Sequence, residues 1–166
     1  MINRLIDEIN QCLDNKCYLS ALMVALTLPD ICGKVEYPTD KPSDRYKKWY
    51  KEWIGQYEHD PDDKDNIFPY PSEEIVYDLR CSMFHEGNPS VNLTNQNLTD
   101  FKLVIYKEWN IGGVSDIASY NGDYYCRTLE IGVKNLIWKL CRLAEVYYAE
   151  NNEKFNFNYT LVERNY

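Results

Sequence analysis

Arg80 and His85 stand five residues apart in the segment 79–87, Leu-Arg-Cys-Ser-Met-Phe-His-Glu-Gly, which holds the clearest candidate chemistry of this 166-residue chain. The guanidinium of an arginine is always charged and can make two parallel hydrogen bonds to a phosphate. Histidine is the side chain best suited to move protons near neutral pH. Together they are the groups needed to cut RNA without a metal ion. His85 would act as general acid or base, and Arg80 would stabilise the charge that develops on the phosphate.

The spacing of these two residues leaves two interpretations open. On a regular α-helix, side chains five residues apart point about 140° away from one another around the axis. To meet at one phosphate they would need an irregular last turn, the long reach of the arginine, or a second subunit. Alternatively, Arg80 pairs with a neighbouring carboxylate and His85 lies at the C-terminal end of a helix, where a positive charge is favourable.

A second candidate site is the basic and aromatic segment 45–53. Arg45, Lys48 and Lys51 accompany aromatic rings there, and such a face can follow a nucleic-acid backbone while its rings stack on bases. Rings at a spacing of three and four residues are also typical of a helix face that packs into a core, with the lysines on the solvated side. The spacing favours the core, and the three cations are the candidates for binding nucleic acid.

The net charge limits what such a surface can do. Lys and Arg number 18 against 26 Asp and Glu, which gives a net charge of −8. An acidic molecule repels polyphosphate at long range, so the charge disfavours a broad nonspecific nucleic-acid surface and leaves room for a narrow site. The N-terminal sequence does not resemble a signal peptide, and the longest apolar run, 21–28, is far shorter than a membrane span. We therefore expect a cytoplasmic protein with no membrane contact.

The sequence offers no motif for a metal or a cofactor. Its six cysteines form no C-x-x-C pair, and most of them fall in apolar periodic segments, where reduced cysteine is a small core residue. The acidic loop 58–65 lacks the glycine of a calcium-binding loop and has Lys64 at a ligand position. Walker and dinucleotide fingerprints are absent from the sequence. We expect no metal site and no cofactor.

Apolar periodicity predicts mainly helical structure around these residues. The first helix should span about 2–15, and a second should begin near Leu19, with Pro29 near its end and Gly33 as its terminator. A third helix should follow a cap at Ser43 or Asp44 and bury its aromatic stripe. The candidate catalytic helix should start after a cap at Ser72 and reach about His85, where Gly87 and Pro89 stop it. The last helix should span about 129–150.

The segment between the last two helices has a different character. The run 101–107 is rich in residues that favour strands, and Asn121-Gly122 is a hairpin turn signal. We therefore expect a small β-hairpin inserted at about 100–127, and the alternating tail 155–161 suggests one short strand. The whole chain, 1–166, is predicted to form one mainly α domain.

A helix that ends in arginine, four residues and histidine, within a small helical protein, resembles the HEPN superfamily of prokaryotic ribonucleases and nucleotide-associated proteins. The segment 79–87 is also similar to a helix end common in bacterial proteins of that type. The resemblance implies a bundle of four or five helices. It also implies a homodimer whose two sets of Arg80 and His85 face each other, which would supply the convergence that one helix lacks. In active members the residue after the arginine is often polar, whereas here it is Cys81.

The implied activity is metal-independent cleavage of RNA by attack of a 2′-hydroxyl, which leaves a cyclic phosphate. The resemblance thus predicts an endoribonuclease of a defence or toxin–antitoxin type, with Arg80 and His85 as catalytic residues and an antitoxin or a nucleotidyltransferase as partner. The alternative is a noncatalytic helical dimer that binds a protein or a nucleotide and uses Arg80 structurally.

Overall fold

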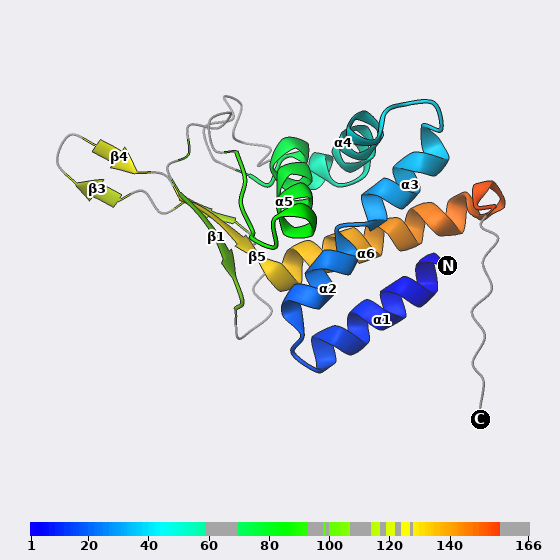
Figure 1. Ribbon diagram of the computed structural model, residues 1–166, viewed down its shortest axis with the longest axis horizontal. Coiled ribbons are helices and arrows are strands. Elements are labelled where there is room, and N and C mark those ends of the chain that lie inside the picture. Colours follow the sequence, from blue (N-terminus) through cyan, green and yellow to red (C-terminus); the bar gives the residue numbers. More distant parts are fainter. Residues whose placement is uncertain are drawn as a thin grey trace.

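The computed structural model shows a mainly helical protein, as the sequence predicts, with a small sheet at one end of the helices (Figure 1). It describes residues 1–58, 70–92, 98, 100–106, 114–116, 119–121, 124–126 and 128–156. The helices are α1 (Ile2–Asp14), α2 (Tyr18–Ala25), α3 (Leu28–Glu36), α4 (Pro42–Trp53), α5 (Glu73–His85) and α6 (Val133–Glu150). The strands are β1 (Asp100–Val104), β2 (Val114–Asp116), β3 (Ser119–Asn121), β4 (Tyr124–Cys126) and β5 (Thr128–Gly132), and short 3-10 turns occupy Gly55–Tyr57 and Asn152–Lys154.

The long helix α6 is the support on which the N-terminal helices pack. It runs behind α2 and α3 and contacts α1, α2 and α3, while α4 packs against both α3 and α5 (Figure 1). The core between these helices is built from large apolar side chains, and its largest fully buried members are Trp49, Tyr46, Tyr50, Tyr147, Ile2 and Ile9. The helix α5, which carries the candidate catalytic residues, packs mainly against α4.

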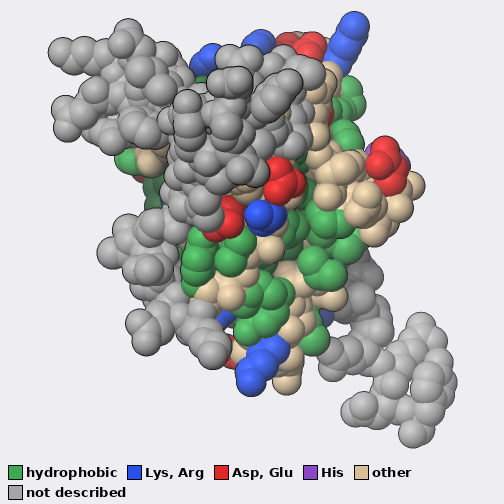
Figure 2. Space-filling view, turned by 90° about the vertical axis from the view of Figure 1, so that its left-hand side faces the viewer, with side chains coloured by type: hydrophobic (Ala, Val, Ile, Leu, Met, Phe, Trp, Pro, Cys, Tyr) green, Lys and Arg blue, Asp and Glu red, His purple; other side chains and the backbone are tan. Residues whose placement is uncertain are grey.

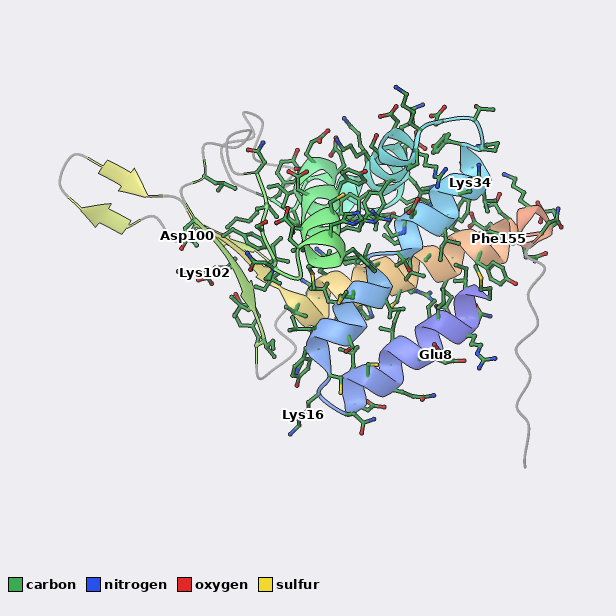
Figure 3. All side chains as sticks on the ribbon, in the orientation of Figure 1. Glu8, Lys16, Lys34, Asp100, Lys102 and Phe155 are labelled. Atoms are coloured by element: carbon green, nitrogen blue, oxygen red, sulfur yellow. The ribbon has the colours of Figure 1, made fainter. Side chains whose placement is uncertain are left out.

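Buried tyrosine hydroxyls tie the helices together at two further points. Tyr147 in α6 donates a hydrogen bond of 2.7 Å to the carboxylate of Glu36 at the end of α3, and this bond lowers the pKa of Glu36. Tyr50 in α4 donates a hydrogen bond of 2.9 Å to the carbonyl oxygen of Pro71, just before α5. Phe155 packs edge-on against Tyr147 beyond the end of α6 (Figure 3). The hydroxyls of Tyr147 and Tyr50 thus both have a hydrogen-bond partner, as buried polar groups usually do.

The predicted span of α1 is confirmed, and so are the predicted first and last residues of α5. The hydroxyl oxygen of Ser72 accepts a hydrogen bond of 3.4 Å from the backbone nitrogen of Ile75 and so caps α5. His85 is the last helical residue, and Gly87 follows with a φ of +66°, a left-handed conformation that glycine adopts without strain. These two signals fix the bounds of the helix that carries Arg80 and His85.

The prediction of one helix from Leu19 past Pro29 is wrong. The chain turns after Ala25, and Pro29 lies in the first turn of α3, where a proline needs no amide hydrogen. Gly33 lies inside α3 rather than at its end. The residues before the turn are apolar on nearly every side of the helix. The spacing of apolar residues therefore does not show where one helix ends and the next begins.

The predicted caps of α4 are also wrong, although its buried stripe is confirmed in part. The helix begins at Pro42 after Lys41, and neither Ser43 nor Asp44 caps it. Of the aromatic residues in and just after the helix, Tyr46, Trp49 and Tyr50 are buried, Trp53 is partly buried and Tyr57 is exposed. The rings of α4 therefore serve mostly the core.

The β structure differs from the single inserted hairpin that the sequence predicts. Strand β1 pairs in parallel with β5, with Phe101 opposite Leu129 and Leu103 opposite Ile131, and β2 pairs antiparallel with the other edge of β5. Strand β5 occupies 128–132, which the sequence assigned largely to the start of α6. Leu129 and Ile131 are buried, and a short apolar run of this kind fits a strand or a helix equally well by pattern alone.

A hairpin does form around the predicted Asn-Gly signal, as the separate pair β3 and β4, which lies away from the helices (Figure 1). On the exposed face of β1, Asp100 and Lys102 form an ion pair of 3.4 Å (Figure 3). The expected tail strand begins with two residues that are not in a strand, and the rest of it lies outside the described residues. The part of the acidic loop that follows Glu58 also lies outside the described residues.

The cysteines follow the expectation only in part. Cys32 and Cys141 are buried, and burial raises the pKa of the Cys141 thiol to about 12. Cys12 and Cys81 are partly buried. Cys17 is exposed in the turn between α1 and α2 and is the exception among the cysteines whose side chains the structure describes.

The stretch Tyr18–Glu36, which comprises α2 and α3, has the length and mean hydropathy of a membrane-spanning segment. The apolar run 21–28 alone is too short for this. Two separate helices occupy this stretch, and 44% of its most apolar window is buried inside the structure. The core helices of a soluble protein have the same character.

Gly33 marks the closest approach of α3 to α4. A Cβ atom at this position would lie 2.6 Å from the backbone oxygen of Arg45 and 3.4 Å from the Cβ of Trp49. Since a backbone oxygen cannot move aside without moving its helix, any larger residue must push α4 away from α3.

We therefore expect Gly33→Ala to lower the free energy of unfolding by about 1–3 kcal/mol, despite the better helix propensity of alanine. Urea unfolding followed by circular dichroism measures this change. The matched control is Gly55→Ala, where the added Cβ would have no neighbour closer than 3.7 Å. Equal stabilities of the two variants would contradict the close approach at Gly33.

Candidate functional site

The candidate site lies on α5, where a regular helix carries Arg80 and His85 to its last turn. The helix continues without a break between them, so the angle of about 140° expected from helix geometry applies. An irregular last turn, which could have brought the two side chains together, is not present. Within one chain, the structure therefore does not bring Arg80 and His85 to one point.

Arg80 is held by a carboxylate from another helix. Its Nη2 lies 3.0 Å from Oδ2 of Asp30 on α3, and the other oxygen of Asp30 accepts a bond of 3.1 Å from Nη2 of Arg45 on α4. The side chains of Arg45, Asp30 and Arg80 are 16%, 23% and 23% exposed. One carboxylate thus serves two guanidiniums and links three helices, and the three side chains together keep one positive charge.

The environment of Arg80 favours its charged form. Partial burial opposes the charge, but the Cys81 sulfur, 4.0 Å from Nη1, and the carboxylate of Asp30 outweigh it and raise the pKa of Arg80. Beside this group lies the buried hydroxyl of Tyr46, whose pKa is raised by burial. The Tyr46 hydroxyl and the Nε of Arg80 have no hydrogen-bond partner within the described ranges.

His85 and its neighbour Phe84 are the exposed part of the site. His85 is exposed at the end of α5, and Phe84 is 41% exposed. Figure 2 shows one face of the molecule, on which hydrophobic side chains lie in the open among charged ones. The Cζ of Arg80 lies 5.5 Å from the centre of the Phe84 ring, within the range of a cation–π contact. A fixed cation, an exposed ring and an exposed imidazole thus follow one another along the last turns of α5.

The cations of the second predicted site are engaged in ion pairs. Arg45 is bound to Asp30, Lys48 to Asp40, and Lys51 to Glu73 at 3.3 Å. Lys51–Glu73 joins α4 to α5, and the carboxylate of Asp40 raises the pKa of Lys48. Arg45 and Lys51 on α4 therefore help to hold α5 in place, and the role of the three cations in binding nucleic acid stays a prediction.

Asp30 is the residue that the sequence reasoning did not single out. A carboxylate partner for Arg80 is one of the two interpretations of the sequence, but Asp30 lies 50 positions away from Arg80 in the sequence. In the sequence, Asp30 is an acidic residue directly after Pro29. It fits the usual preference for acidic residues in the first turn of a helix. Nothing in that preference points to Arg80.

Two other hollows lie apart from these residues. One has a volume of about 280 Å³ and is lined by Ile54, Tyr57, Trp138, Lys139, Arg142 and Leu143. The other, of about 330 Å³, is lined by Asn10, Leu13, Asp14 and Lys134. Neither of these two hollows is lined by Arg80 or His85.

Comparison of the chain with models of protein families, with curated proteins and with solved structures gives no significant match. The resemblance to the HEPN superfamily therefore stays a prediction from the segment 79–87.

The shared carboxylate leads to a first test of the site. We expect Asp30→Asn to lower the free energy of unfolding by about 1–3 kcal/mol, because it leaves two partly buried guanidiniums close together without their counter-charge. Denaturant unfolding at neutral pH measures this loss.

The matched control is Glu8→Gln on α1 (Figure 3), which breaks the exposed ion pair of 3.2 Å with Arg4. That change should cost less than about 0.5 kcal/mol. If both variants lower the free energy of unfolding by the same small amount, Asp30 does not hold Arg80 in the way described.

Proposed function

We propose that this protein is a HEPN-like, metal-independent endoribonuclease of the cytoplasm, which acts as a homodimer in a defence or toxin–antitoxin setting. The observation that carries the proposal is the arrangement on α5: Arg80 is kept charged and oriented by Asp30, and His85 is exposed in the next turn. These are the two residue types that RNA cleavage without a metal ion requires.

The chemistry follows from the two side chains. His85 accepts the proton of a ribose 2′-hydroxyl, whose oxygen attacks the adjacent phosphorus, and the protonated imidazole of His85 in either subunit donates a proton to the leaving 5′-oxygen. The bond from phosphorus to that 5′-oxygen breaks, and the upstream fragment keeps a cyclic phosphate. Arg80 stabilises the extra negative charge on the phosphate oxygens during this step.

A second subunit would overcome the divergence of Arg80 and His85 on one helix. In a symmetric dimer that pairs the ends of two α5 helices, the histidine of one subunit approaches the arginine of the other.

One observation favours a second function. Arg80 already donates a hydrogen bond to the carboxylate of Asp30. The role of Arg80 could therefore be to join α5 to α3, without any contact with a substrate. On that basis the protein would be a noncatalytic helical dimer that binds a protein or a nucleotide, for example an antitoxin or a nucleotidyltransferase.

Cleavage of RNA in the presence of EDTA separates the two functions. We expect the wild-type protein to cut a labelled RNA panel into fragments with a cyclic phosphate end, and His85→Ala to lower the rate at least about 100-fold. Arg80→Lys should lower it by a similar factor, since lysine lacks the planar fork that holds a phosphate at two points. Gel analysis and mass spectrometry of the products measure rate and end group.

The matched control is Arg142→Lys, an exposed arginine on α6 whose ion pair with Glu145 lies outside the candidate site. It should cleave at the wild-type rate. Absence of cleavage, or equal cleavage by wild type and His85→Ala, would leave the noncatalytic function as the better account.

The dimer is a separate expectation. Light scattering at micromolar concentration should give twice the monomer mass of 19.7 kDa. A strictly monomeric protein that cleaves RNA would show that Arg80 and His85 act within one chain.

A further inference from the structure

Phe84 is an exposed aromatic side chain placed between the two candidate catalytic residues. It is 41% exposed, although most large aromatic side chains of the described helices are buried or half-buried. The other large apolar side chains exposed in the described structure are Leu19, Tyr57, Ile105 and Trp138, on other elements. Phe84 alone among these five lies on α5 beside His85.

The contact between Phe84 and Arg80 gives the ring a defined place. The two residues are one helical turn apart, a spacing at which side chains meet, and the guanidinium carbon is 5.5 Å from the ring centre. Because Asp30 holds the same guanidinium, the contact restrains the Phe84 ring through a residue that is itself fixed in the fold. The ring is thus both exposed and partly preorganised.

We propose that Phe84 is the residue on which a base next to the cleaved phosphate stacks, which requires that this base is unpaired. This proposal rests on the proposed function, since the phosphate that Arg80 and His85 act upon would sit beside the ring. Stacking of a base on an aromatic side chain is independent of sequence, because every base has a flat π-face. It places the base, and with it the ribose and phosphate attached to it.

The requirement for an unpaired base follows from what the ring needs. A base in a duplex is already stacked on its neighbours and its face is closed, whereas bases in single strands, loops and bulges can turn outward onto a ring. The charge of −8 adds to this, because binding a duplex without reading its bases depends on many contacts with phosphates. A single ring beside one guanidinium suits a short stretch of unpaired RNA.

The test measures binding separately from cleavage. Fluorescence anisotropy in EDTA would follow a labelled RNA of about 12 nucleotides, single-stranded or annealed to its complement. All variants carry His85→Ala, which keeps the RNA intact, and add Phe84→Leu, Phe84→Tyr or, as an exposed aromatic control on α6, Trp138→Leu. Leucine keeps the apolar bulk of Phe84 and removes its π-face, while tyrosine keeps the face.

We expect Phe84→Leu to weaken binding of the single strand by about 5- to 100-fold, and Phe84→Tyr and Trp138→Leu to change it by less than about twofold. Duplex binding should be weak and the same in all variants. Equal binding of the single strand with and without the Phe84→Leu substitution, or a duplex bound as tightly as the single strand, would overturn the proposal.

Failure of stacking and failure of catalysis give different results. If the wild-type protein cleaves RNA but Phe84→Leu binds normally, the stacking proposal is wrong and the endoribonuclease stands. If the wild-type protein does not cleave but single-strand binding depends on Phe84, catalysis is wrong and the stacking site stands. If no protein binds RNA, both are wrong.

Discussion

The carboxylate of Asp30, shared by Arg45 and Arg80, is the interaction through which the fold and the candidate site depend on one another. A partly buried guanidinium loses much of its hydration, and a carboxylate at 3.0 Å restores that loss only when both groups are held in place. The close approach of α3 and α4 at Gly33 supplies the placement, since it brings Asp30 and Arg45 together. Arg80 then completes the group from α5.

The elements with a clear apolar face could be predicted from the sequence, and the others could not. The helices α1 and α5 follow a spacing of three and four residues, and the bounds of α5 follow from Ser72 and Gly87. Helix α2 is apolar nearly all round, so its apolar pattern does not show where it ends and α3 begins, and β5 is too short to be told from the start of α6. In both places tertiary packing, not local pattern, decides the structure.

The same division holds for the site. Arg80 and His85 stand out in the sequence because arginine and histidine have distinctive chemistry, but the partners of Arg80 come from other helices. Asp30 is far from Arg80 in the chain, and the ion pairs of Lys48 with Asp40 and of Lys51 with Glu73 also join residues that lie apart in the sequence. Phe84 resembles an ordinary core residue until its exposure is known.

The central claim, that Asp30 fixes Arg80, is tested most directly by a double-mutant cycle. Free energies of unfolding would be measured for the wild type, Asp30→Asn, Arg80→Gln and the double variant. The account predicts a coupling energy of about 1–2 kcal/mol between the two sites, with the double variant less destabilised than the sum of the single ones. Additivity within about 0.5 kcal/mol would contradict it, because independent residues add in this way.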